Sequence, residues 1–263
     1  MELQWALDLT VRTAAAGLFI AGLELWALRR EFSETGIFSS GALAAPAKDQ
    51  RMLAGFGPFL RPAIAVQVLA AATLAAAGPF SPWGKISLAW LLGAFLLLRW
   101  RRRIAGDGAE QMSAIILLSA FLAVIPTESP LRMAAAVLFI AAQAVLSYTT
   151  AGVAKLISPL WRQGQALPLI LSTRSHGHPL AARVLGSSRG LAAAACWTVI
   201  VFEIGFGPLA LGSQGTLVAV LGIGLAFHLG CAVFMGLNTF LWSFPATYPC
   251  VAAGCLMARD LLA

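Results

Sequence analysis

Three ionisable side chains stand inside long apolar stretches, where they could hold or transfer protons. Glu203 lies in WTVIVFEIGFGPL, His228 in GIGLAFHLGCAVF, and Lys155 near the end of SYTTAGVAKLI. Because a charge is costly to bury, each of them must be neutral, paired or directed into a cavity. Groups held in this way are suited to general acid–base chemistry. Lys155, Glu203 and His228 are therefore candidate functional residues of a buried site.

The sequence alone leaves the partners of these residues open. Glu203 and His228 lie on consecutive apolar stretches, so an antiparallel hairpin would bring them together as an ion pair or a proton-sharing pair. The same contact could instead be a structural hydrogen bond that locks two helices. Taken alone, the position of Lys155 near a helix end favours a side chain that extends to the nearest polar boundary. It could also be buried as a neutral amine that acts as a base.

The composition indicates the environment that surrounds these residues. Hydrophobic residues make up 59% of the 263-residue chain and charged residues only 11%, against roughly 25% charged in soluble domains. Apolar runs of about 20 residues, the length that crosses a bilayer, follow one another. The net charge of +7 comes mostly from basic residues between these runs, so nucleic acid is not a predicted partner. The predicted partner is the lipid bilayer.

Lipid offers the backbone no hydrogen-bond partners, so each run must be a helix, and the chain lacks the alternation of a barrel. We predict an all-α, polytopic membrane bundle in a single domain, 1–263. The third helix is expected to be the shortest. The eight predicted helices are 7–28, 60–79, 85–99, 109–126, 131–156, 190–211, 215–236 and 240–259.

Lysine and arginine alternate between rich and poor connections, which predicts the orientation. The first, third and fifth connections are basic and are expected in the cytoplasm, with both termini outside. The run from Arg99 to Arg103 is then most simply a cytoplasmic anchor. The two longest connections, 29–59 and 157–189, are predicted on this same face, and loops of such length are often functional.

Other polar residues give weaker signals. In GDGAEQM, Asp107 and Glu110 fit a helix-capping pattern, and Gln111 lies deeper. His176 and His178 share a loop without a carboxylate, so solvated histidines are favoured over metal ligands. No metal site is predicted, and the four cysteines, which form no metal-binding pattern, are expected to be buried thiols. An interfacial belt or a pocket lining could be formed by Tyr148, Trp161, Asn238, Trp242 and Tyr248.

Several of these segments occur together in one known family. The stretch from Tyr148 to Leu167, YTTAGVAKLISPLWRQGQAL, resembles a segment of the vitamin K-dependent gamma-glutamyl carboxylases. Phe227–His228 followed by Met235–Gly236 is similar to a late helix of that family. GDGAEQM resembles a motif of bacterial proteins in the wider group, the horizontally transferred transmembrane domain (HTTM) family. The motifs occur in matching order and cover residues 106–249.

The resemblance implies a carboxylase-like membrane enzyme of the bacterial inner membrane, a member without the carboxylases' soluble C-terminal domain. Its cofactor would be reduced vitamin K or a related quinone. Lys155 falls at the family's base, although one lysine of the family's pair is replaced here by Ala154. Glu203 and His228 would position or relay protons. The implied cofactor-binding residues are Glu110, Gln111, Tyr148, Trp161 and Asn238.

The reaction implied is a quinone- and oxygen-dependent carboxylation, or a related modification, of a peptide or lipophilic substrate, of carbon–carbon lyase or quinone-epoxidising type. A non-enzymatic accessory or maturation factor is the alternative, and a small transporter is a weaker one. The enzyme hypothesis predicts that Lys155, Glu203 and His228 converge on one cavity. The accessory hypothesis predicts that Lys155 points to the membrane interface. The oligomeric state has no sequence signal.

Overall fold

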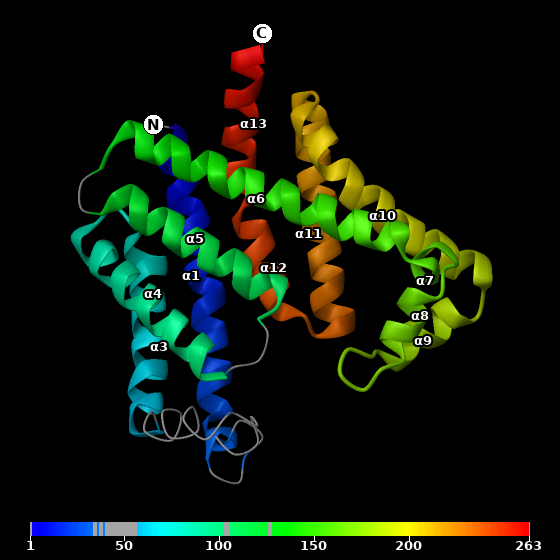
Figure 1. The fold of residues 1–263 in the computed structure, drawn as a ribbon, viewed down its shortest axis with the longest axis horizontal. Helices are drawn as coiled ribbons and strands as arrows, with labels where there is room; N and C mark the ends of the chain where they lie inside the picture. Colours follow the sequence, from blue (N-terminus) through cyan, green and yellow to red (C-terminus); the bar gives the residue numbers. More distant parts are fainter. Residues whose placement is uncertain are drawn as a thin grey trace. The chain divides into compact units, whose positions relative to one another are not determined.

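The computed structural model describes residues 2–33, 36, 39, 57–102, 106–125 and 128–262. Within these ranges every regular element is a helix, which confirms the all-α prediction (Figure 1). The chain packs as two compact units, Leu3–Ala136 and Val137–Ala263, with the boundary inside one long helix. The single domain, 1–263, stays a prediction. Lys48, Arg51 and Arg103 of the basic connections lie outside the described residues.

By length and composition, six spans of the described chain can cross a membrane, which makes the protein a multi-pass membrane protein. They are α1 (Glu2–Ala27), Gly57–Ala77 with α3 (Leu60–Ala77), α6 (Pro130–Ile157), α10 (Arg189–Leu211), α11 (Gln214–Met235) and Asn238–Asp260.

The eight predicted ranges all coincide with helices, but eight crossings are not confirmed. The two others are α4 (Pro82–Arg102), which ends in arginines, and α5 (Gly108–Val124). The expectation for the third helix was wrong, because α4 has 21 residues and α5 has 17.

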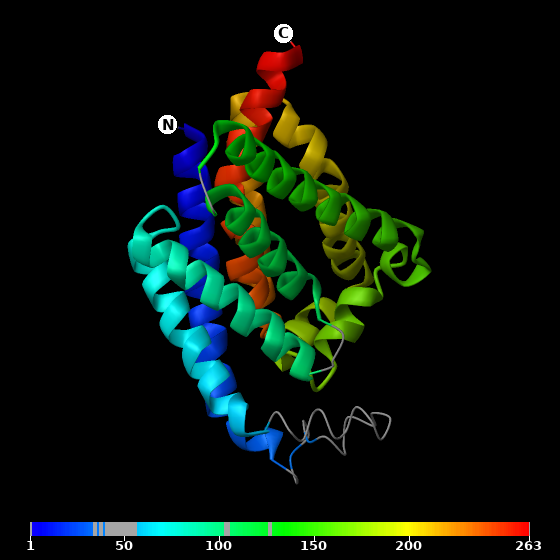
Figure 2. The same ribbon diagram turned by 60° about the vertical axis from the view of Figure 1, so that its left-hand side comes forward.

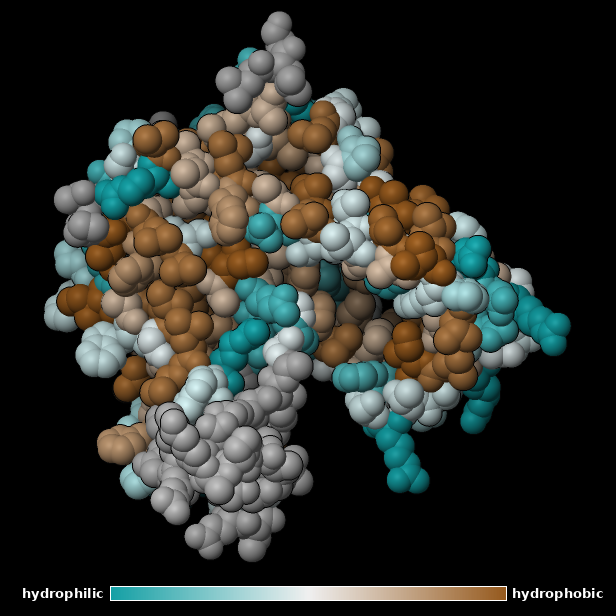
Figure 3. Space-filling model, in the orientation of Figure 1, coloured by the Kyte–Doolittle hydropathy of each residue, from teal (hydrophilic) through white to brown (hydrophobic). Residues whose placement is uncertain are grey.

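The outward surfaces of these helices are apolar. Only 22% to 44% of the most apolar window of each span is buried inside the protein. Large side chains such as Leu69, Val201 and Val218 are exposed by 64% or more. Apolar residues accordingly cover much of the visible surface in Figure 3. Contiguous apolar surface of this kind is unfavourable in water and suits contact with lipid.

The first unit is built on α3 and α4, which run side by side in Figures 1 and 2 and are joined by a short turn. Leu60 and Ile64 of α3 pack with Leu98 of α4 and with Phe32 in the 3-10 turn Arg29–Phe32. Gln67 is buried on α3 and donates to the Leu18 carbonyl of α1 at 3.1 Å. This bond satisfies a polar side chain that neither lipid nor core could solvate.

Two residues of the predicted cytoplasmic anchor have partners inside this unit. Arg101 is buried, with its guanidinium 5.6 Å from the ring centroid of Phe32. Arg99 lies 3.7 Å from the carboxylate of Glu110. A role confined to headgroup anchoring therefore does not describe these two arginines.

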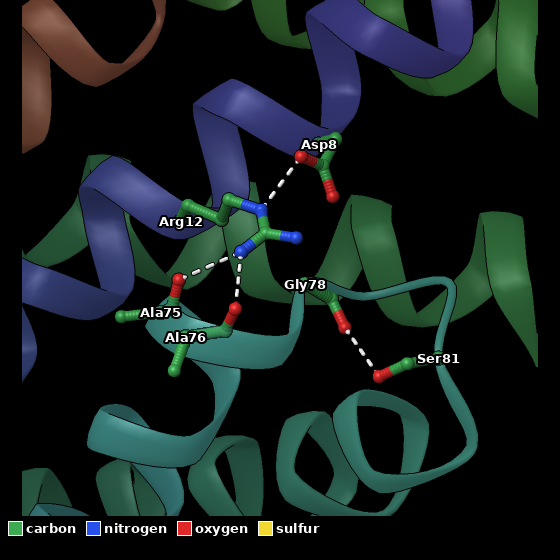
Figure 4. A network of polar contacts seen from close by, with 6 residues as sticks. All are labelled: Asp8, Arg12, Ala75, Ala76, Gly78 and Ser81. Atoms are coloured by element: carbon green, nitrogen blue, oxygen red, sulfur yellow. Dashed lines mark hydrogen bonds and ion pairs between the residues drawn. The ribbon is translucent and has the colours of Figure 1, made fainter.

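An arginine from α1 closes the C-terminal end of α3 (Figure 4). Arg12 donates to the carbonyls of Ala75 at 3.0 Å and Ala76 at 2.6 Å, and its Nε pairs with Asp8 at 2.6 Å. The last carbonyls of a helix have no partner within the helix and carry partial negative charge, so a guanidinium satisfies both requirements. Gly78, with φ 73°, ends the helix in a backbone region that favours glycine.

The second unit contains the C-terminal part of α6 and the helices that follow it. Ser188 and Ser213 cap α10 and α11 by accepting from backbone N–H groups of Leu191 and Thr216. Gly236, with φ 69°, ends α11. Arg259 donates to the carbonyls of Ala210 at 2.8 Å and Ser213 at 3.2 Å, and so caps the C-terminus of α10.

Two expectations for this unit were wrong. The connection 157–189 was predicted as a loop, but it contains α7 (Pro159–Arg162), α8 (Ala166–Leu171) and α9 (Pro179–Gly186). Pro159 and Pro179 start helices, because proline at the first helical position forfeits no hydrogen bond. The last predicted helix is divided at Thr247 into α12 (Asn238–Ala246) and α13 (Tyr248–Leu262). Because Pro249 has no backbone N–H, it cannot donate the hydrogen bond that would continue one helix across Thr247.

Replacing Arg12 tests the importance of the α3 cap. We expect Arg12→Met to lower the free energy of unfolding by about 1–2 kcal/mol, because two carbonyls lose a charged donor and Asp8 loses its counter-ion. Thermal unfolding of the purified protein in detergent measures the loss. The double variant Asp8→Asn/Arg12→Met should recover part of it, since the lone carboxylate is then removed. A single variant as stable as the wild type would contradict this account.

Candidate functional site

A cavity of about 790 Å³ lies within the second unit. Its walls come from α6, from the short helices α7 to α9, and from α10, α11 and α12, and most of them are apolar or aromatic. Lys155, Glu203 and His228 all line it, as do Tyr148 and Trp161. The structure therefore brings together the three predicted catalytic residues, on three different helices, while their catalytic role stays a prediction.

Lys155 and Glu203 form an ion pair across α6 and α10. The Lys155 ammonium donates to both carboxylate oxygens of Glu203, at 2.8 and 2.7 Å. The Glu203 side chain is only 5% exposed and that of Lys155 20%. The ammonium also lies 5.2 Å from the ring centroid of Trp161. Lys155 thus points inward, which is the arrangement expected for the enzyme hypothesis and not for a lysine that extends to the interface.

Glycines let α6 and α10 approach closely enough for this pair. A Cβ atom at Gly152 of α6 would stand 2.8 Å from Ile204 Cγ1 and 3.0 Å from Glu203 Cβ, inside normal contact distance. A Cβ at Gly207 of α10 would stand 2.8 Å from Val145 Cγ1. Small residues at such crossings are a general means of close helix packing in membranes. Gly152 lies one turn before Lys155, so the close approach occurs beside the ion pair.

His228 belongs to a separate polar cluster. Its Nε2 lies 2.7 Å from the hydroxyl of Tyr148, which in turn lies 2.9 Å from the hydroxyl of Tyr248. The predicted contact between Glu203 and His228 is absent from the described part of the chain, and that expectation was wrong. The reason is α6, whose residues Tyr148 and Lys155 are seven positions apart on one face and supply a different partner to each.

Stacked aromatic rings hold this second cluster in place. The ring of Tyr148 stacks on Phe206 with centroids 4.0 Å apart, and His228 stacks on Phe244 at 5.0 Å. Phe240 stacks in turn on Phe244 at 5.7 Å. Sequence reasoning missed these phenylalanines. A signal was present, because Phe202 and Phe206, like Phe240 and Phe244, are four residues apart and so share a helix face.

Other predicted residues are not among those that line the cavity. Asn238 begins α12 and does not line the cavity. Tyr248 does not line it either, but its hydroxyl lies beside the hydroxyl of Tyr148, which does. Glu110 and Gln111 belong to α5, in the first unit. Asp107 accepts from the Glu110 N–H at 2.8 Å, which confirms the helix cap. The expectation that Glu110, Gln111 and Asn238 bind a cofactor stays a prediction.

The two loop histidines differ. His176 is exposed, as expected for a solvated side chain. His178 has a structural role that was not expected, since its Nδ1 accepts from Ala181 N–H at the start of α9 and its ring contacts Phe234 of α11 edge-on. Both His178 and Phe234 line the cavity. The short helices of the long connection therefore form one wall of the site.

The described residues contain no group of three histidine, cysteine, aspartate or glutamate side chains that could hold a metal. All four cysteines are free, and three are buried as predicted, but Cys231 is only half-buried because it lines the cavity. The fold and site thus define a multi-pass helical membrane protein with an ion pair and a histidine–tyrosine cluster in one apolar cavity. No protein-family model, curated protein or solved structure matches the chain, so the resemblance to carboxylases rests on its sequence motifs.

The glycine contact between α6 and α10 can be tested with a matched pair of variants. Gly152→Ala should lower the free energy of unfolding by about 1–3 kcal/mol, because the methyl group must push apart the two helices that hold the ion pair. Gly205→Ala is the control, since its Cβ would meet only Leu209 at 3.5 Å. Thermal unfolding of both variants in one detergent gives the comparison. Equal unfolding temperatures for Gly152→Ala and Gly205→Ala would contradict the proposal that α6 and α10 need glycine at position 152 to approach closely.

Proposed function

We propose that the protein is a membrane-embedded enzyme that binds a reduced quinone in this cavity and uses Lys155 as a base. The observation that carries the proposal is the inward-facing Lys155–Glu203 pair, 2.7–2.8 Å between charged groups in an apolar cavity. A buried ion pair seldom repays the loss of hydration, so its presence at a cavity wall favours function over stability.

The lining residues fit a quinone. A cavity of about 790 Å³ lies within the range of small-molecule sites, roughly 300–1,000 Å³. Trp161, Phe240 and Phe244 supply flat apolar surfaces for a ring, and Tyr148 and His228 supply polar atoms. His228 Nδ1 is buried without a hydrogen-bond partner among the described residues, as expected for an atom reserved for a ligand. When bound, a hydroquinone supplies acidic hydroxyl groups and reducing electrons.

Lys155 and Glu203 can hold a proton in two ways. In the ionic form, Nζ carries the proton, and Trp161 stabilises the cation through its ring face. Transfer of that proton over 2.7 Å to Glu203 leaves a neutral amine beside a neutral acid, and an apolar cavity penalises this form less than water does. The neutral Lys155 Nζ can then accept a proton from an acidic hydroxyl group. Glu203 acts as the store for the displaced proton.

The sequence motifs support a finer assignment. The resemblance to vitamin K-dependent carboxylases favours a quinone- and oxygen-dependent carboxylation, or a related modification, of a peptide or lipophilic substrate. Such a site would operate in the bacterial inner membrane, in a cavity whose walls are mostly apolar. Exclusion of water protects a strongly basic intermediate from quenching.

Retained quinones and turnover test the proposal together. Mass spectrometry of the purified wild type should detect a bound naphthoquinone, and Lys155→Ala should retain it as well, since the ring contacts are intact. Oxygen-dependent consumption of the reduced quinone should fall by about 100-fold or more in Lys155→Ala, the scale of a lost general base. Only bulk phospholipid in the wild type would favour the accessory-factor hypothesis.

Folding of the lysine variant needs its own control. Removing Lys155 leaves Glu203 as an unpaired buried charge, which costs about 3–5 kcal/mol. The double variant Lys155→Met/Glu203→Gln removes both charges and keeps similar volumes. It should unfold close to the wild-type temperature and still lack turnover. Wild-type turnover in this double variant would refute the role of Lys155 as the base.

A further inference from the structure

We infer that His228 donates Nδ1–H to an acceptor oxygen of the ligand, and that Tyr148 and Tyr248 fix the tautomer that allows this. The inference rests on the proposed function, because it concerns the same cavity. It adds the chemical requirement that the ligand present a carbonyl or an oxyanion beside an apolar ring. It also assigns a positioning role to two tyrosines.

The direction of the hydrogen bonds sets the tautomer. Tyr148 has one hydroxyl proton and lies 2.7 Å from His228 Nε2 and 2.9 Å from the Tyr248 hydroxyl. A phenol is a stronger donor than a neutral imidazole N–H, and an imine nitrogen is a stronger acceptor than a phenol oxygen. Tyr148 therefore donates to Nε2 and accepts from Tyr248. Since Nε2 is then the acceptor, the ring proton of His228 is on Nδ1.

The Nδ1 atom of His228 has no hydrogen-bond partner among the described residues. It is buried, in a residue that is only 2% exposed, and no group of the described chain forms a hydrogen bond with it. Such an orphaned donor is costly unless a bound molecule satisfies it. His228 lines the cavity, so the cavity is where that molecule would lie.

Gly224 leaves room for Tyr248, which donates to Tyr148 and so sets the direction of the hydrogen bonds that lead to His228. A Cβ atom at Gly224 would collide with the Tyr248 hydroxyl. On the same helix, Gly222 has nothing within 4 Å of its Cβ position. Gly224→Ala therefore displaces Tyr248 from Tyr148, whereas Gly222→Ala is a matched control that leaves both tyrosines in place.

The tautomer can be measured directly. The chain has three histidines, so ¹⁵N-histidine labelling in lipid bilayers gives few signals, and His228→Phe assigns those of His228. The wild type and Gly222→Ala should show the Nδ1–H tautomer. Tyr148→Phe should shift His228 toward Nε2–H, and Gly224→Ala should raise the Nε2–H fraction to a smaller extent. A wild-type His228 protonated at Nε2 would overturn the inference.

Binding of two probes tests the ligand requirement. Equilibrium dialysis compares 1,4-naphthoquinone, which carries two carbonyls, with naphthalene, which carries none, in the same micelles. His228→Phe keeps the stacking surface toward Phe244 and should reduce the preference for the quinone by about 3- to 10-fold, the effect of one buried hydrogen bond. Naphthalene affinity should stay constant.

The outcomes separate the two proposals. An undiminished quinone preference in His228→Phe would overturn the role of His228 and leave the quinone pocket standing. Failure of the wild type to bind either probe would overturn the pocket itself, and the inference with it. A lost preference in His228→Phe together with Nδ1–H in the wild type supports both.

Discussion

The ion pair between Lys155 and Glu203 determines how α6 and α10 meet in the second unit. Two charged groups removed from water are favourable only at short range and with their hydrogen bonds satisfied. Both Glu203 oxygens accept from Lys155, so the geometry meets that condition. It can do so only because Gly152 allows α6 and α10 to approach without an intervening side chain. The backbone packing and the chemistry of the site therefore depend on each other.

A second regularity concerns arginines at helix ends. Arg12 caps α3, Arg132 donates to the carbonyls of Leu122 and Ile125 at the end of α5, and Arg259 caps α10. In each case a cation meets carbonyls that have no partner within their helix. The number of basic residues in each connection, which predicts membrane orientation, assigns these arginines no structural role. The structure gives them a role in closing helices within each unit.

Helix positions and the three candidate residues could be predicted from the sequence, because both follow from local pattern. Apolar length marks a helix, and a charge such as Glu203 within such a length is conspicuous. The partners could not be predicted. Whether Glu203 meets His228 or Lys155 depends on which face of α6 packs against α10, and apolar runs all around a helix carry no signal of facing direction.

The short helices α7 to α9 show a different limit. Proline and glycine usually indicate loops, and the segment 157–189 is rich in both. Pro159 and Pro179 nevertheless begin helices, and Trp161 of α7 and His178, which caps α9, both line the cavity. The functional role of this connection stays a prediction. It was based on the length of an expected loop, whereas the structure shows short helices that line the cavity.

One face of α6 links the two polar groups of the cavity. Tyr148 and Lys155 are seven residues apart, so their Cα atoms are separated by about 10 Å along the helix axis, at 1.5 Å per residue. The proposed base and the proposed hydrogen-bond donor at His228 are thus at different levels of one apolar cavity. Under the proposed function, a single ligand that contacts both groups carries polar atoms at two separated points with apolar surface between them. A hydroquinone, with an oxygen atom on each side of its ring, meets that requirement.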